Sequence, residues 1–282
     1  MTATPFEPLY DRAVAELLDG PVEERRIETA VGETHLLLAG DPDAKPLLVL
    51  QGGNVTTPVT LAWVEALADE YRLLAPDTPG QPGKTTARTA DYGRWLVALL
   101  DGLGVEAVPA VGLSHGAGVL LEALVRAPDR FESVSLVVPA GFGVGPPAGL
   151  ARVGVPSLAY RSLPRRWLLD RALGSLATEP PGSLPPVVRD TIAAALRTAD
   201  LMTGFPGPTR DALRTVGVPV FGVVAADDPF FPARTIGPRI RTTFPECREV
   251  LTLPDERHFL GPAGRSQLCH ALRGFLESEA TG

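Results

Sequence analysis

Cysteine and long apolar runs are scarce in this chain of 282 residues. Its two cysteines, Cys247 and Cys269, are too few for a disulfide framework, which favours a reduced, cytoplasmic setting. No apolar run approaches the roughly 20 residues that a helix needs to span a bilayer. The N-terminal stretch from Met1 to Asp19 contains acidic residues and lacks the continuous apolar core of a signal peptide. We therefore expect a cytoplasmic protein without a membrane partner.

Positive charge is also limited. The chain has 26 lysines and arginines against 33 aspartates and glutamates, and the net charge of -7 argues against a nucleic-acid partner. The two cysteines and four histidines lack the spacing of metal ligands, so we expect no metal and no other cofactor. Apolar residues make up 45% of the chain and charged residues 21%, as in ordinary globular proteins. The length fits one large domain or a domain with an insertion.

Strand-like and helix-like segments alternate along most of the chain. We expect strands at residues 26–31, 34–38, 46–50, 71–75, 107–113, 133–138, 218–225 and 248–253. Helices are expected at 59–69, 91–103, 119–126, 233–243 and 264–277. The first two strands predict an antiparallel hairpin around Gly32, and the later alternation predicts a mostly parallel sheet with helices on both faces. Ligands of such sheets bind beyond the carboxyl ends of the strands.

The alternation is interrupted between residues 141 and 210. This segment contains ten prolines and has helix-like pieces at 164–173 and 186–198. So many prolines exclude the interior of a sheet, and the segment is too long for a structureless loop in a compact domain. We expect a helical cap inserted into an α/β core that comprises residues 1–140 and 211–282. The alternative is a surface excursion without function.

The sequence Gly112-Leu113-Ser114-His115-Gly116 stands between an expected strand and an expected helix. Gly-x-Ser-x-Gly in this context is the nucleophile-elbow pattern, in which a strained turn exposes the serine hydroxyl. Side chains at the two glycine positions would collide with the neighbouring strand and helix. The N–H of His115, at the start of the helix, is well placed to meet negative charge.

A serine hydroxyl needs a base within hydrogen-bond reach and an acid that orients the base. The expected chain order is Ser, then Asp or Glu, then His. Asp228 follows the strand at 218–225 and His258 follows the strand at 248–253, so both can converge on Ser114. Asp227 and Asp255 are alternative acids. The other histidines lie in the N-terminal hairpin, beside the serine and in the last helix: His35, His115 and His270.

A second oxyanion donor is expected from the loop after the strand at 46–50. Gly52-Gly53 lets the backbone approach a substrate closely, and we assign the Gly53 N–H to an oxyanion hole with the His115 N–H. The alternative is an ordinary glycine turn. The predicted substrate-binding residues are Asn54, Phe142, Trp167 and Phe230. In the expected cap, Arg161, Arg165 and Arg166 form either a solvated face or an anchor for a substrate carboxylate.

Over residues 26–278 the chain resembles the α/β-hydrolase fold superfamily. The matching motifs are the serine elbow, the loop Asp77-Thr78-Pro79-Gly80-Gln81-Pro82-Gly83-Lys84-Thr85, the segment Asp227-Asp228-Pro229-Phe230-Phe231-Pro232, and His258 before the last helix. The resemblance implies the α/β-hydrolase fold and acyl-transfer chemistry on Ser114. The chain departs from it at Gln51, where the family often has His, and at Arg257, where it often has Gly. We expect both departures to change the polarity around the site.

These observations predict a serine hydrolase that cleaves an ester, thioester or amide of a small, largely apolar substrate. The first alternative is a lyase, cyclase or thioesterase of a biosynthetic pathway that uses the Ser–His pair as acid and base. The second is a catalytically silent protein that binds a small molecule on this fold. Either a monomer or a homodimer is compatible with the sequence.

Overall fold

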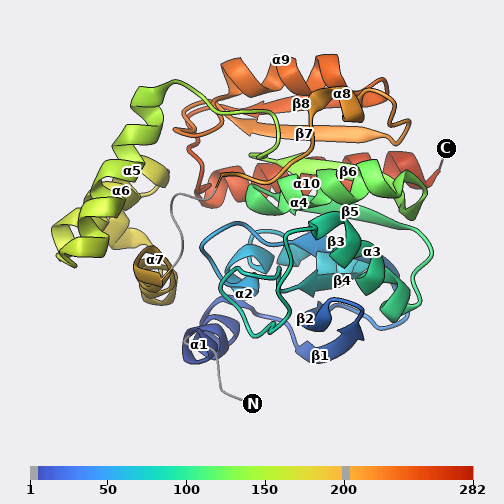
Figure 1. Ribbon diagram of the computed structural model, residues 1–282, viewed down its shortest axis with the longest axis horizontal. Coiled ribbons are helices and arrows are strands. Elements are labelled where there is room, and N and C mark those ends of the chain that lie inside the picture. Colours follow the sequence, from blue (N-terminus) through green and yellow to red (C-terminus); the bar gives the residue numbers. More distant parts are fainter. Residues whose placement is uncertain (1–5, 199–203, 282) are drawn as a thin grey trace.

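The computed structural model describes residues 6–198 and 204–281, which fold around one eight-stranded sheet (Figure 1). The strand order is β1-β2-β4-β3-β5-β6-β7-β8. β1 pairs antiparallel with β2 and β2 with β4, and every other neighbouring pair is parallel. The strands are β1 (Val22–Thr29), β2 (Gly32–Ala39), β3 (Lys45–Leu50), β4 (Tyr71–Pro76), β5 (Val108–Leu113), β6 (Phe131–Val137), β7 (Val220–Ala225) and β8 (Cys247–Leu253). This topology confirms the expected α/β-hydrolase fold.

Helices cover both faces of the sheet. One face packs against α3 (Tyr92–Leu103), α4 (His115–Arg126), α8 (Arg210–Leu213) and α9 (Ala233–Thr243). The other packs against α1 (Glu7–Leu17), α2 (Thr57–Leu61), the short helix η1 (Glu65–Asp69) and α10 (Pro262–Ala280). A single helical turn, η2 (Pro128–Arg130), leads into β6. Among the helices of the described residues, none is long and apolar enough to cross a membrane.

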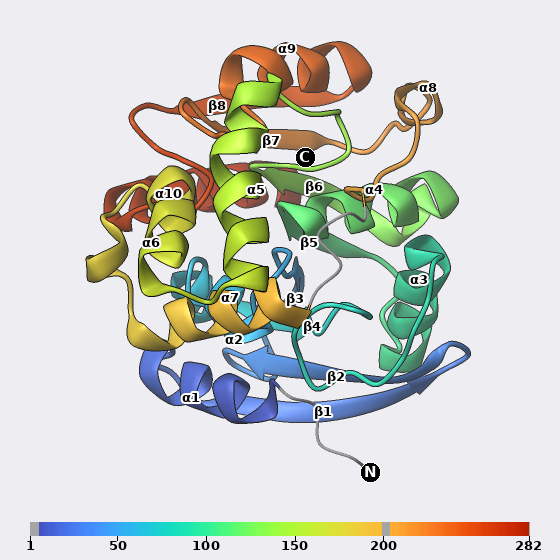
Figure 2. The ribbon, with the colours of Figure 1, turned by 60° about the vertical axis from the view of Figure 1, so that its left-hand side comes forward.

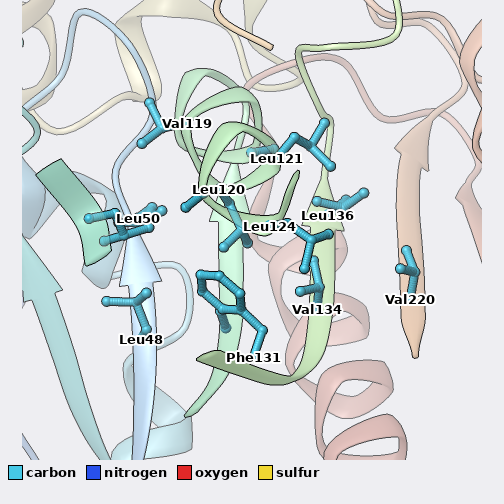
Figure 3. Packing of buried hydrophobic residues seen from close by; sticks show 14 of the residues in the cluster. Leu48, Leu50, Val119, Leu120, Leu121, Leu124, Phe131, Val134, Leu136 and Val220 are labelled. Carbon is cyan, nitrogen blue, oxygen red and sulfur yellow. The ribbon is translucent and has the colours of Figure 1, made fainter. Parts of the chain in front are cut away.

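The helix that follows Ser114 is anchored by its apolar side chains. Leu120 and Leu124 of α4 pack among side chains of β3, β6 and β7 (Figure 3). Both leucines are fully buried, and burying such a side chain stabilises a fold by about 1.5–3 kcal/mol. Since α4 starts directly after Ser114, this packing fixes the position of the serine on the sheet.

Three longer helices stand apart from these two layers. They are α5 (Pro147–Ser162), α6 (Arg166–Leu176) and α7 (Pro186–Thr198), with the turn η3 (Pro181–Ser183) between the last two. Figures 1 and 2 show them gathered at one side of the sheet, with α7 next to α1. Their buried side chains form a third apolar cluster, which also includes Ala13 of α1 and Val59 of α2.

The structure differs from the expected elements at three helices or helical segments. The helix expected at 59–69 is two short helices, α2 and η1, separated by a turn. The sequence reading assigned no helix at α1 or α5. α5 escapes detection because its apolar residues do not recur with a helical period and because Pro156 lies inside it, where proline removes a backbone donor.

Candidate active site

Ser114 occupies a sharp turn between β5 and α4. Its φ of 50° and ψ of -110° lie in a region that non-glycine residues rarely adopt. The turn needs the flanking glycines, because a Cβ at Gly112 would lie 2.6 Å from the Cα of Ala117. A Cβ at Gly116 would lie 2.4 Å from the carbonyl oxygen of Leu50. The structure therefore shows, at both glycine positions, the steric crowding that was predicted to explain the Gly-x-Ser-x-Gly spacing.

The hydroxyl of Ser114 begins a chain of three hydrogen-bonded side chains. His258 Nε2 lies 2.9 Å from Ser114 Oγ, and His258 Nδ1 lies 2.7 Å from Asp228 Oδ2. The buried Asp228 accepts the N–H groups of Phe230 and Phe231 on its other oxygen, at 2.7 and 2.9 Å. These bonds hold the carboxylate towards Nδ1, so that Nε2 is the nitrogen that accepts the serine proton. The structure thus brings together the three residues expected to form a triad.

The competing acids and bases lie elsewhere. Asp227 is exposed, and its N–H donates to the carbonyl oxygen of Glu256. Asp255 is an exposed turn residue with a φ of 57°. His270 is exposed on α10, and His35 is a buried residue of β2 that contacts other carboxylates, those of Glu24 and Asp77.

Gly53 and His115 line the cavity together with Ser114, and each contributes a backbone N–H group. The loop after β3 places Gly53 so close to His115 that a Cβ on the glycine would lie 3.1 Å from the His115 Cβ. The neighbouring donors are occupied: Gly52 N–H binds Thr60 Oγ1 at 3.0 Å, and Asn54 N–H binds Gln81 Oε1 at 2.9 Å. Within the described residues, no hydrogen bond engages the N–H of Gly53 or of His115. This arrangement fits an oxyanion hole.

The His115 side chain lines the cavity as a neutral group. Burial lowers the pKa of His115 to about 4. Its Nε2 lies 3.2 Å from Gln81 Nε2, and its ring meets the edge of the Tyr92 ring with 5.6 Å between the centroids. Gln81 therefore holds both the His115 ring and the N–H of Asn54 in place. This role of Gln81 was not predicted from the sequence, although Gln81 lies within the loop motif of residues 77–85.

The two departures from the superfamily pattern do not alter the polarity of the cavity, because neither side chain lines it. Gln51 is fully buried and makes four hydrogen bonds, two within residues 51–57 and two that tie the loop after β3 to the loop after β4. Arg257 donates to the carbonyl oxygens of Gly174 and Ala177 at the C-terminal end of α6. A cation is favourable there because it faces the negative end of the helix dipole. Both residues are structural ties.

A cavity of about 660 Å³ opens at Ser114 and His258. Its apolar wall comes largely from the three helices α5–α7, through Leu150, Val153, Leu158, Ala172, Leu173, Leu176, Ile192 and Leu196. Asn54 and Phe230 line the cavity as expected. No three His, Cys, Asp or Glu side chains in the described part of the chain are grouped so that they could hold a metal ion.

Two residues expected in the cavity are elsewhere. Phe142 is 2% exposed and belongs to the core beneath the sheet, where its ring packs against Phe244. Trp167 is 65% exposed at the start of α6. Arg161, Arg165 and Arg166 are also exposed, and none of them lines the cavity. They therefore do not form a carboxylate anchor there, because the helices α5 and α6 turn a different face towards the cavity.

Comparisons with known proteins agree with this geometry. A model of the alpha/beta hydrolase family matches residues 48–264. The carboxylesterase YbfK of Bacillus subtilis is 30% identical over 142 residues, which are 48% of this chain and 47% of that protein. The uncharacterised carboxylesterase nap of the same organism is 33% identical over 122 residues, 40% of each chain. The chain thus matches less than half the length of these curated relatives.

Among solved structures, the naproxen esterase (carboxylesterase NP) of Bacillus subtilis superposes with a TM-score of 0.83 at 20% identity, over 96% of both chains. At that identity the likeness supports the fold. The family model covers most of the chain and includes the serine elbow, Asp228 and His258. The chain belongs to the alpha/beta hydrolase family.

Proposed function

We propose that this protein hydrolyses carboxylic esters through an acyl-enzyme formed on Ser114. The observation that carries the proposal is the unbroken chain of hydrogen bonds from Asp228 through His258 to Ser114 Oγ, which opens into a largely apolar cavity. The similarity to two carboxylesterases supports the same reaction.

In the first half of the reaction, His258 Nε2 removes the hydroxyl proton as Ser114 Oγ attacks the ester carbonyl carbon. Asp228 holds the ring in the required tautomer and stabilises the imidazolium that forms. The carbonyl oxygen gains negative charge, which the N–H groups of Gly53 and His115 stabilise. His258 then gives its proton to the leaving alcohol, and the acyl group remains on the serine.

In the second half, water attacks the acyl-enzyme with His258 as the base, and the acid is released. The neutral imidazole of His115 adds no positive charge beside the developing oxyanion, so the backbone donors carry the stabilisation.

We further propose that the helices α5–α7 act as the cap of this site. Their apolar side chains form much of the cavity wall, and the volume of about 660 Å³ suits a small, largely apolar ester. The Arg257 contacts to Gly174 and Ala177 attach α6 to the loop that carries His258, so the helices and the base are held in one arrangement.

Hydrolysis of p-nitrophenyl esters with acyl chains of increasing length tests the proposal. We expect saturable release of p-nitrophenol by the wild type and loss of about a million-fold in kcat for Ser114→Ala. His270→Ala is the control, since this exposed histidine is remote from the cavity and its variant should keep wild-type rates. Equal rates for Ser114→Ala and the wild type, or no hydrolysis by the wild type across the series, would contradict the proposal.

A further inference from the structure

Two residues of α4 line the cavity at separate points. His115 and Glu122 are seven residues apart, which places them on the same face of the helix, with Gly118 between them. Pro206 covers Gly118, because a Cβ on this glycine would lie 2.3 Å from the carbonyl oxygen of Pro206. Both His115 and Glu122 line the cavity. The cavity therefore reaches from Ser114 to Glu122, and Pro206 lies against α4 between the two ends.

The carboxylate of Glu122 is half-buried at this wall. Burial raises the pKa of Glu122, and the N–H groups of Gly207 and Tyr92 oppose that rise by donating hydrogen bonds to the charged form. The bond from Gly207 N–H to Oε1 is 3.2 Å long. Tyr92 is the first residue of α3, so the carboxylate also faces the positive end of that helix. These contacts stabilise the charged form of the carboxylate at the cavity wall against the effect of burial and of the nearby Asp91.

Among residues 6–198 and 204–281, those that line the cavity offer no positive charge to balance a substrate anion. None of the described residues that line it is a lysine or an arginine. His115 is neutral around pH 7 because burial lowers its pKa to about 4. In the resting state proposed above, His258 must also be neutral to accept the serine proton. Glu122 is then the single formal charge among the lining residues that the structure describes.

We propose that Glu122 selects the substrate by charge: the enzyme prefers esters that carry an ammonium group at the Glu122 end of the cavity and rejects esters that carry a carboxylate there. The inference rests on the proposed esterase function and names the substrate class of that site. A half-buried carboxylate attracts a cation at contact distance more strongly than bulk water allows, whereas an anion brought to the same place would be repelled.

The surroundings of Glu122 suit a cation in a second way. The ring of Tyr92 also lines the cavity, and burial together with the charge of Glu122 raises the pKa of the Tyr92 hydroxyl. Aromatic faces beside a carboxylate are the surroundings in which proteins bind alkylammonium groups.

The spacing along α4 predicts where the charged group sits on the substrate. Glu122 follows Ser114 by eight residues, which corresponds to about 12 Å along a helix that rises 1.5 Å per residue. A chain of several methylene groups between the ester carbonyl and the ammonium group spans this distance. Shorter ammonium esters would leave the charge short of the carboxylate, in the apolar part of the cavity.

Binding to the Ser114→Ala protein tests the inference, with three methyl esters that have the same methylene chain and differ in the end group. Methyl 8-aminooctanoate ends in ammonium, methyl nonanoate in methyl and monomethyl azelate in carboxylate. By isothermal titration calorimetry at neutral pH, we expect the ammonium ester to bind about ten-fold or more tightly than the carboxylate ester, with the neutral ester between them. A ratio near one, or tighter binding of the carboxylate ester, would overturn the inference.

A second substitution in the same background assigns the preference to Glu122. In the Ser114→Ala protein, Glu122→Gln should bring the ratio of the ammonium to the carboxylate affinity close to one. Glu106→Gln removes an exposed carboxylate remote from the cavity and should keep the ratio. An unchanged ratio in Glu122→Gln would overturn the assignment. These measurements do not depend on turnover, so they stand apart from the p-nitrophenyl ester assay, which decides the esterase function.

Discussion

Two histidines in this molecule are each hydrogen-bonded to a buried aspartate, and they have different surroundings. His258 Nδ1 lies 2.7 Å from Asp228, and its Nε2 faces Ser114 in the cavity. His35 Nδ1 lies 3.0 Å from Asp77, and its Nε2 lies 2.9 Å from Glu24. A His–Asp pair alone therefore does not define an active site.

The difference lies in what the second ring nitrogen meets. In the cavity it meets a hydroxyl that can be deprotonated beside an open space, whereas His35 is fully buried between two carboxylates. The surroundings of His35 are saturated: Asp77 also accepts the Lys84 N–H and the Thr57 hydroxyl. This second pair ties the loop after β4 to β1 and β2, so it holds structure, whereas the first pair is the one that we propose performs chemistry.

The largest expected effect comes from disabling the orienting acid of the first pair. Asp228→Asn should lower kcat for p-nitrophenyl esters by about ten-thousand-fold, because asparagine favours the wrong tautomer of His258. The free energy of unfolding should change much less than the activation free energy. The reason is that Asn retains an oxygen that can accept the N–H groups of Phe230 and Phe231. Steady-state kinetics and urea unfolding measure the two quantities. A rate within ten-fold of wild type would show that Asp228 does not orient the base.

The matching substitution in the second pair should act on stability. Asp77→Asn leaves His35, Lys84 N–H and Thr57 with a weaker partner in a buried place. Breaking a buried ionic network in this way lowers the free energy of unfolding by about 3–5 kcal/mol. Urea unfolding measures the loss, and kcat of the folded fraction should stay within a few-fold of wild type. If Asp77→Asn lost as much catalysis as Asp228→Asn and kept its stability, the His35–Asp77 pair would have a catalytic role and not a structural one.

A smaller effect on stability is expected at Glu24, the partly exposed carboxylate that contacts His35 of the second pair. Burial raises the pKa of Glu24, but hydrogen bonds from Lys84 and His35 outweigh this and lower it below the ordinary value of 4.5. A carboxyl whose pKa is lowered by folding stabilises the protein above that ordinary value, and the contribution disappears as the pH falls through the lowered pKa. Glu24→Gln should therefore unfold more readily than wild type near pH 7, with the difference shrinking below about pH 4. Thermal melts across this pH range measure it, and a difference that grows on acidification would contradict the assignment.

The sequence allowed most of the sheet and the candidate triad to be predicted, for physical reasons. Buried parallel strands are short apolar runs that end in turn residues, and the residues that follow them meet at one edge of the sheet. Ser114, Asp228 and His258 each follow such a run, and the flanking glycines of the elbow are needed for steric reasons. Local patterns therefore carried information about a site built from distant parts of the chain.

The cavity wall could not be predicted in the same way. Which face of a helix turns inward depends on how helices such as α5 and α6 pack together, and α5 has no helical period to reveal its inner face. Proximity in sequence placed Phe142 and Trp167 near the cavity, but the fold sends one into the core and the other to the surface. Glu122 lies on α4 among core residues, and only the structure shows that it lines the cavity.

Covalent labelling with a fluorophosphonate, followed by peptide mapping, tests the central claim that Ser114 is the nucleophile. The account predicts one phosphonyl group per chain, located on the peptide that contains Ser114, and esterase activity that falls in proportion to labelling. Asp77→Asn protein that remains folded should label at a rate close to wild type, and Asp228→Asn far more slowly. Stoichiometric labelling of another residue, or full esterase activity after complete labelling of Ser114, would contradict it.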